Sequence, residues 1–374
     1  MVLMALDHTR DFFGNVPYSP VDLAHTTPAL FLTRWVTHLC APVFVFLAGA
    51  GAYLSTMRGR GSRAELSRYL AIRGLWLVVL DLVFFNTAWM FHFTIHWLSA
   101  MVLWAIGWSL VTLAALVWLP RNVALIFGLV LIAGHNALDG VQPSDSGVRS
   151  GLWRILHAAG VIDLGSGFKL AADYPLIPWI GVVAVGYAFG PMLTAGESVR
   201  RKRLAVLGAA LVAAFIVIRW SNVYGNPVPW SPQKNSVFTA ISFLNCQKYP
   251  PSLCFLLMTL GPALLLLAAF DRGAPRILQP LVTFGRVPLF YYVLHIPLIH
   301  AVYVLTCLVR FGRADWSYGF QPGVDPHPPV PPNAGFSLPV VYLSWILFVA
   351  ALYPACRWFA DVKEHRRDAW LTFF

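Results

Sequence analysis

Residues 248–270 read KYPPSLCFLLMTLGPALLLLAAF, and this stretch decides the class of the fold. After Lys248 the chain carries no charged side chain until Asp271. An apolar run of about 20 residues is long enough for a helix to cross the hydrocarbon core of a bilayer. The stretch is therefore predicted to contain a transmembrane helix.

The rest of the chain has the same character. Apolar types make up 58% of the 374 residues and charged types only 11%, whereas a soluble domain has about 45–50% and about 25%. Nine full segments are predicted, at roughly 30–55, 70–90, 97–119, 122–140, 175–195, 203–220, 251–270, 281–309 and 337–360. The sequence thus predicts an all-α, polytopic integral membrane helical bundle that forms a single domain over residues 1–374.

The start of the chain supplies only part of a further helix. Six apolar residues precede Asp7, and they span about 9 Å at 1.5 Å per residue. We therefore expect ten transmembrane helices of which the first is truncated, or a natural start upstream of Met1.

Basic residues predict the orientation of these helices. Arginine and lysine gather in alternate links, at 58–73, 121, 200–203, 272–276 and 363–367. The positive-inside rule places these links, and with them both termini, in the cytoplasm. The net charge of +11 is explained in this way and does not indicate a nucleic-acid partner.

Ionisable side chains near helix ends are candidates for function, because such residues are costly within a membrane. Seven polar groups map to predicted outward helix ends or loops: His8, His25, His92, His96, His135, Asp139 and Lys248. Any one of them is more simply explained as an interfacial anchor. His8 and His25 stand out because acidic residues that could orient an imidazole lie nearby in the sequence. The histidines lack a recurring ligand spacing and the five cysteines are scattered, so no metal site is predicted.

Several segments together resemble a known family. They are LMALDHTRDFF (3–13), HLCAPVFVFLAGAGAYL (38–54), YPLIPWIGVVAVGY (174–187), KYPPSLCFLLMTLGPALLLLAAF (248–270) and FGRVPLFYYVLHIPLIH (284–300). Over nearly its whole length the chain resembles the bacterial branch of the heparan-α-glucosaminide N-acetyltransferase family. The lysosomal member moves an acetyl group from cytosolic acetyl-CoA to the amine of a terminal glucosamine across the membrane. The resemblance implies a transmembrane acetyltransferase in the bacterial cytoplasmic (inner) membrane.

The resemblance also implies catalytic residues. The family's catalytic histidine lies upstream of the motif that is Pro42–Gly49 here, and His25 is the nearest upstream candidate, although the spacing is longer than in the lysosomal enzyme. We expect His25 to act as general base or transient acetyl carrier and His8 as its partner or as an oxyanion donor. Asp7 or Asp11 would fix an imidazole tautomer.

The remaining expected roles concern the two substrates. Residues that could shape the acceptor end are Asn136, Asp139, Lys248, Tyr249 and His295. Arg286 and Arg73 are expected to bind the phosphates of acetyl-CoA, although the positive-inside rule alone would explain most arginines on that side.

Other functions remain open at this point. Ten helices and a polar outward cavity would also suit a transporter of a small solute or glycan precursor, and a non-catalytic membrane subunit is a third class. The expected partners are the lipid bilayer, acetyl-CoA and an amino-sugar or glycan acceptor. The acceptor's identity and homodimerisation are left open.

Overall fold

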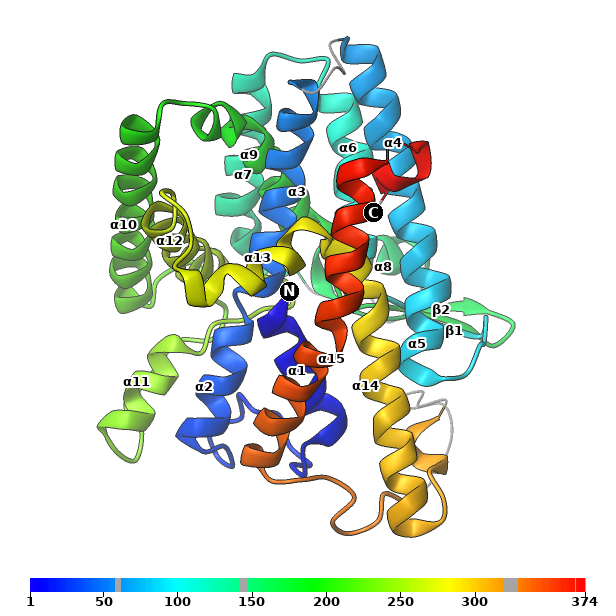
Figure 1. Ribbon diagram of the computed structural model, residues 1–374. Coiled ribbons are helices and arrows are strands. Elements are labelled where there is room, and N and C mark those ends of the chain that lie inside the picture. The colour runs from blue at the N-terminus through cyan, green and yellow to red at the C-terminus, as the bar shows by residue number, and fades with distance from the viewer. Residues whose placement is uncertain (58–61, 142–146, 319–328, 367, 374) are drawn as a thin grey trace. The chain divides into compact units, whose positions relative to one another are not determined.

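The computed structural model describes residues 1–57, 62–141, 147–318, 329–366 and 368–373 (Figure 1). Arg58, Arg60 and Arg367, which contribute to the predicted orientation, lie outside these residues. The chain divides into two compact units: unit 1 is Met1–Cys40, Phe85–Thr94 and Gly273–Phe374, and unit 2 is Ala41–Phe84 and Ile95–Arg272. The single domain over residues 1–374 stays a prediction.

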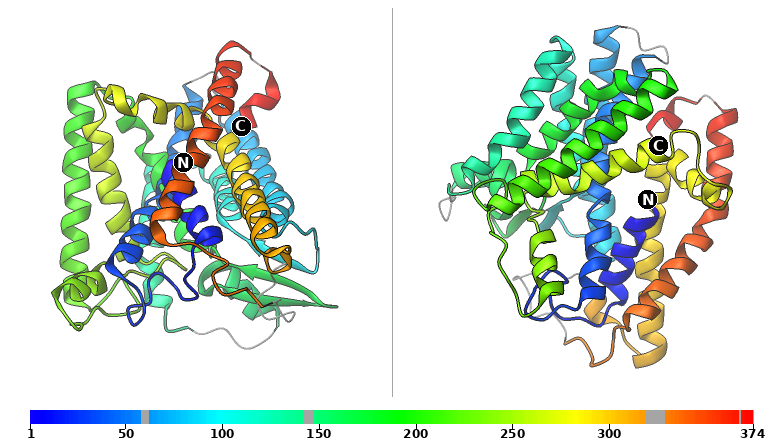
Figure 2. Two further views of the ribbon diagram at one scale, coloured as in Figure 1. Left: turned by 60° about the horizontal axis from the view of Figure 1, so that its bottom comes forward. Right: turned by 90° about the vertical axis from the view of Figure 1, so that its left-hand side faces the viewer.

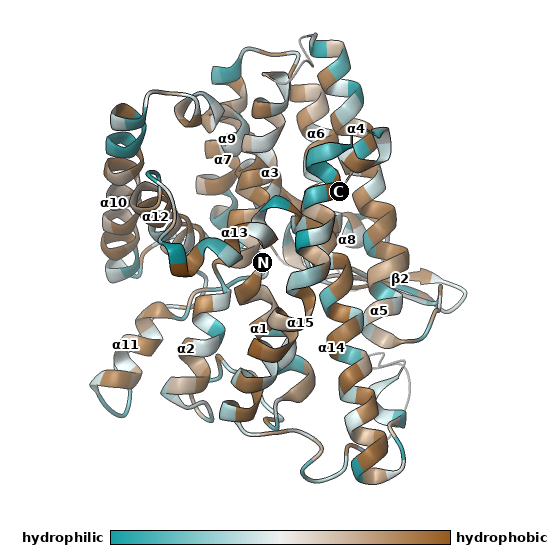
Figure 3. Cartoon of the chain, in the orientation of Figure 1, coloured by the Kyte–Doolittle hydropathy of each residue, from teal (hydrophilic) through white to brown (hydrophobic). Residues whose placement is uncertain are grey.

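The long apolar helices confirm the predicted fold class. Seven helices are long and apolar enough to cross a membrane: Pro28–Thr56, Arg63–Met90, Arg121–Leu138, Leu176–Leu193, Glu197–Ser221, Pro288–Phe311 and Leu338–His365. Two shorter apolar helices, Val102–Leu116 and Leu253–Ala269, occupy the other two predicted segments. Figure 3 shows hydrophobic colour along these helices and hydrophilic colour at the start of α10. The chain is an all-α polytopic membrane protein, and its predicted orientation stays a prediction.

Unit 1 is a group of helices around one apolar core. Its helices are α1 (Val2–Phe13), α2 (Pro28–Thr37), α5 (Asn86–Met90), α13 (Gln279–Arg286), α14 (Pro288–Phe311) and α15 (Leu338–His365). The short helix α1 packs against α2, α14 and α15. Helix α2 begins where the Thr27 side chain accepts a hydrogen bond from the Leu30 amide, with Pro28 in the first turn.

Unit 2 is built from pairs of closely packed helices. Its helices are α3 (Cys40–Thr56, from Ala41 on), α4 (Arg63–Val79), α6 (Val102–Leu116), α7 (Arg121–Gly134), α8 (Val148–Trp153), α9 (Leu176–Leu193), α10 (Glu197–Ser221), α11 (Ser236–Leu244) and α12 (Leu253–Ala269). Helix α4 packs on α6, α7 on α9, and α10 on α12 (Figure 1 and Figure 2). Glycines allow the helices to approach closely. A Cβ at Gly74 would lie 2.5 Å from the carbonyl oxygen of Gly107, and a Cβ at Gly107 would lie 2.5 Å from the carbonyl oxygen of Gly74. Small residues at such interfaces let helix backbones meet in a membrane.

Unit 2 also contains a small sheet that the prediction omitted. Its strands are β1 (Trp97–Ala100), β2 (Gly160–Gly165) and β3 (Phe168–Ala172), in the order β1-β3-β2. Strand β1 pairs in parallel with β3, and β2 pairs antiparallel with β3. Because β1 takes up Trp97–Ala100, the helix predicted from residue 97 begins at Val102.

A proline explains a second difference between the predicted and the observed helices. The segment predicted at 281–309 is broken into α13 and α14 at Val287, whose φ of −131° and ψ of 53° are not helical. The ring of Pro288 disfavours a helical conformation for the residue before it. Pro288 then occupies the first turn of α14, where a missing amide proton costs nothing.

Candidate active site

Two imidazoles meet inside unit 1. The ring of His8, on α1, lies 5.2 Å from the ring of His295, on α14, measured between centroids. Trp89, on α5, contacts His8 edge-on at 4.9 Å. His295 is fully buried. Three helices that are distant in the sequence therefore form one histidine site.

The backbone of α14 fixes the tautomer of His295. Its Nδ1 lies 2.7 Å from the carbonyl oxygen of Tyr292 and 3.1 Å from that of Tyr291. A carbonyl oxygen only accepts hydrogen bonds, so Nδ1 must carry the ring proton. The other nitrogen, Nε2, then holds a lone pair in the neutral imidazole and can accept a proton.

Several buried polar atoms around this pair have no hydrogen-bond partner among the described residues. They are His295 Nε2, His8 Nδ1 and Tyr291 Oη. The Tyr291 ring stacks on that of His295 at 5.3 Å. Buried polar groups in proteins are normally paired, so a group of unpaired ones indicates a place where water or a ligand binds.

Asp7 is bound to other side chains of the same unit. Its carboxylate accepts hydrogen bonds from Arg10 at 2.9 Å, from Thr37 at 3.0 Å, and from Arg34. These contacts join α1 to α2. The expected role of Asp7 in fixing an imidazole stays a prediction, but the observed contacts are those of a buried ion pair.

Asp11 lies closer to the histidine pair. One carboxylate oxygen is 3.8 Å from His8 Nδ1, which is longer than a hydrogen bond. The other oxygen accepts from Arg10 at 2.7 Å. Asp11 therefore contributes negative charge beside His8 without a direct hydrogen bond.

His25 belongs to a separate and more exposed pair. Its Nδ1 is 2.6 Å from a carboxylate oxygen of Asp22, and 65% of the His25 side chain is exposed. The hydrogen bond with His25 lowers the pKa of Asp22 below its ordinary value. An ionised carboxylate on Nδ1 orients the ring and leaves Nε2 available to a substrate.

The predicted acceptor residues of unit 2 fall into two groups. The Asn136 side-chain amide donates to Asp139 at 2.8 Å and accepts from the Leu253 backbone amide at 2.8 Å. The Lys248 ammonium lies 4.9 Å from the ring centroid of Tyr249. Tyr174 joins this second group, with its hydroxyl 3.5 Å from that of Tyr249.

The two predicted phosphate-binding arginines differ in their surroundings. Arg286, in unit 1, is 62% exposed and lies 3.5 Å from a carboxylate oxygen of Glu364. Arg73, in unit 2, donates to the hydroxyl of Tyr69 at 3.2 Å. The exposed guanidinium of Arg286 is thus the freer of the two to meet a phosphate.

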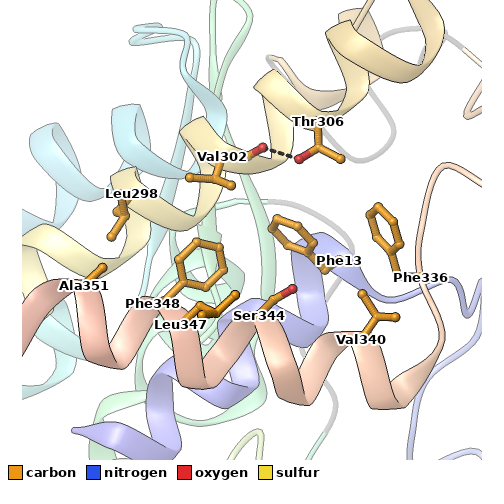
Figure 4. Close-up of a pocket in the computed structure, with 10 residues that line it drawn as sticks. All are labelled: Phe13, Leu298, Val302, Thr306, Phe336, Val340, Ser344, Leu347, Phe348 and Ala351. Carbon is orange, nitrogen blue, oxygen red and sulfur yellow. Dashed lines mark hydrogen bonds between the residues drawn. The ribbon is translucent and has the colours of Figure 1, made fainter.

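An apolar pocket of about 430 Å³ lies between α1, α14 and α15 of unit 1 (Figure 4). It is lined by Phe13, Leu298, Val302, Thr306, Phe336, Val340, Ser344, Leu347, Phe348 and Ala351. No lining side chain titrates, so this pocket suits an apolar group rather than proton transfer.

Comparison with known families matches the first part of the chain. The family model described as "Heparan-alpha-glucosaminide N-acetyltransferase, catalytic" covers residues 1–222, which is more than half of the chain. The chain belongs to this family. It is therefore a transmembrane acetyltransferase. No curated protein matches it.

The family match includes some of the predicted site residues of this acetyltransferase. His8, His25, Asp7, Asp11, Arg73, Asn136 and Asp139 lie within the matched residues, whereas Lys248, Tyr249, Arg286 and His295 follow them. The structure brings His8 and His295 together in unit 1, and Asn136 and Asp139 together in unit 2. The role of each residue stays a proposal.

Sequence reasoning missed several residues of these groups, including Tyr174. Trp89 and Tyr291 contact the histidine pair, and nothing in the sequence marks them among the many aromatic side chains. His157 lies beside Asp139, at 3.6 Å. A histidine in the loop between two predicted spans was a signal that could have found it.

Proposed function

We propose that this acetyltransferase moves an acetyl group from acetyl-CoA to an amine or hydroxyl group of a sugar on the outer side of the membrane, and that the transfer depends on histidine. The observation that carries the proposal is the contact of His8 with His295, in which both rings present a buried nitrogen with no partner among the described residues. The expected location is a bacterial cytoplasmic membrane.

The chemistry requires a base near neutral pH. His295 Nε2, with its lone pair fixed by the Nδ1 hydrogen bond, would take a proton from the attacking amine or hydroxyl. The nitrogen or oxygen of the acceptor forms a bond to the acetyl carbon, and the carbon–sulfur bond of the thioester breaks. The proton passes from the imidazole to the CoA sulfur, which leaves as a thiol.

The oxyanion that develops on the acetyl carbonyl needs hydrogen-bond donors. The Tyr291 hydroxyl, whose ring stacks on that of His295, is a buried donor without a partner among the described residues. His8 is a second, through the ring nitrogen that carries its proton. Such donors typically contribute about 3–4 kcal/mol each to transition-state stabilisation.

His25 is the second candidate for the base. The Asp22 carboxylate on its Nδ1 supports that role, and its exposure would admit a substrate. Of the other expected residues, Arg286 and Arg73 would bind CoA phosphates, and Asn136, Asp139, Lys248 and Tyr249 would contact the acceptor.

The test measures release of CoA thiol from acetyl-CoA by the purified protein, with and without glucosamine. We compare the unchanged protein with His8→Gln, His295→Gln and His25→Gln, and with the exposed His96→Gln as a matched control. Removal of a general base should slow turnover about 10²–10⁴-fold, so His295→Gln should lose activity while His96→Gln keeps it.

The outcomes separate the candidates. Loss of activity in His25→Gln alone would assign the base to His25 and overturn the role of the buried pair. Unchanged activity in all three variants would overturn histidine dependence. Solute counterflow without thiol release would overturn the proposed reaction and support the transporter alternative.

A further inference from the structure

Three side chains of types that can bind a metal ion lie close together in unit 2. His135 lies in the 3₁₀ turn His135–Leu138 that follows α7, Asp139 follows that turn, and His157 lies in the π-helical turn Arg154–Ala158. His135 Nδ1 is 3.4 Å from His157 Nε2. His157 Nε2 is 3.6 Å from Asp139 Oδ1. The three ligand atoms all lie within 4.8 Å of one another.

We propose that His135, Asp139 and His157 bind a zinc ion. In a tetrahedral zinc site with bonds of about 2.0–2.2 Å, the ligand atoms lie about 3.3–3.5 Å apart. The His135–His157 and His157–Asp139 separations match that spacing within about 0.3 Å. The third separation is bounded only by 4.8 Å, so the side chains must draw together to complete the geometry. Two imidazoles and one carboxylate leave the fourth position open, as in zinc sites that hold water or a substrate.

Neighbouring residues hold the ligands in place. Asn136 donates to Asp139 Oδ2 at 2.8 Å, which leaves Oδ1 on the side of His157. The Asn136 oxygen is itself fixed by the backbone amide of Leu253. Trp153 stacks on His157 with 5.1 Å between ring centroids. Metal ligands in proteins are generally oriented by such outer contacts.

The burial of these side chains limits how an ion could reach them. Both histidines are almost completely buried, and the Asp139 side chain is 20% exposed, so an ion would enter from the Asp139 side. His157 Nε2 lies 2.9 Å from the backbone oxygen of His135 and donates its proton there. Zinc requires the lone pair of that nitrogen, so metal binding moves the ring proton of His157 to Nδ1 and requires the imidazole to turn away from the His135 oxygen.

The experiment titrates the purified full chain, prepared without a histidine tag and stripped with chelator, with zinc chloride. We expect one zinc ion per chain by calorimetry and by elemental analysis. Asn136→Ala should weaken binding about 10–100-fold, as loss of an outer contact does elsewhere. His157→Gln should abolish binding, and the matched control His96→Gln should bind zinc as the unchanged chain does.

A second measurement does not depend on acetyl transfer, and it can be made on the unchanged chain, whose folding no substitution affects. Cobalt(II) in place of zinc should give the visible absorption of a tetrahedral site. Asp139→Asn preserves the shape of the side chain and should lose that spectrum. Absence of zinc binding by the unchanged chain, or full binding by both His157→Gln and Asp139→Asn, would overturn the proposal.

Discussion

Asp7 offers the sharpest separation of a structural from a catalytic role. The sequence places it beside His8, where it could orient an imidazole. In the structure its carboxylate instead accepts from Arg10, Arg34 and Thr37. We predict that Asp7→Asn chiefly lowers the free energy of unfolding, because it leaves buried guanidinium charge without its counter-charge.

The contacts set the size of the effect. Removing one partner of a buried ion pair costs about 3–5 kcal/mol. Arg10 keeps its contact with Asp11, so the ion pair that is lost is mainly that of Asp7 with Arg34, whose side chain is 16% exposed. The asparagine amide can still accept from Thr37. We therefore expect the lower end of that range, about 3 kcal/mol.

Unfolding in mixed detergent micelles measures this free energy. The matched control is Asp11→Asn on the same helix, where the 38% exposed carboxylate should contribute less than about 1 kcal/mol. Arg34→Met combined with Asp7→Asn removes both charges, so the double variant should be less destabilised than the sum of the singles. The ion-pair explanation would be refuted if Asp7→Asn and Asp11→Asn lowered the free energy of unfolding equally and the effects of Asp7→Asn and Arg34→Met were additive.

Three further predictions concern the scaffold. Gly49→Ala should lower the free energy of unfolding by about 1–3 kcal/mol, because the new Cβ would lie 2.0 Å from the carbonyl oxygen of Val183. The control Gly51→Ala should be neutral, because a Cβ there would have no atom within 4 Å. Burial raises the pKa of the Cys246 thiol to about 12, so at pH 8 mass spectrometry should find it alkylated only after unfolding; rapid labelling of the native protein would contradict this. Arg219→Leu should lower the free energy of unfolding by at least about 3 kcal/mol in the same micelle assay, because it leaves four backbone carbonyls without their charged donor. A decrease of less than about 1 kcal/mol would contradict this prediction.

Hydropathy predicted the membrane segments because burial in lipid demands a long apolar run whatever its neighbours are. Each of the nine predicted segments contains an apolar helix. Hydropathy could not predict strand β1, because Trp97–Ala100 is as apolar as a helix start and becomes a strand only by pairing with Lys169–Ala172. Nor could it predict the break at Val287, although Pro288 was a local signal that could have found it.

The site was less predictable for a physical reason. The sequence identifies polar residues near helix ends, but which of them meet depends on tertiary packing. His8 and His295 were assigned to different roles, and only the packing of α1 on α14 brings them together. Arg219 was overlooked, although an arginine at the end of a span that is predicted to face outward departs from the positive-inside rule and needed an explanation.

Buried polar residues of this chain differ in how fully their hydrogen bonds are satisfied. An ionisable side chain at membrane depth is a candidate for function by default, yet the guanidinium of Arg219 makes four bonds to backbone oxygens and the carboxylate of Asp7 binds three side chains. Such groups hold helices and loops together, and their cost of burial is offset within the fold. His8 and His295 are buried as well, but each keeps a nitrogen without a partner among the described residues. A membrane protein gains no stability from that arrangement, and under the proposed function a reacting substrate would complete those bonds.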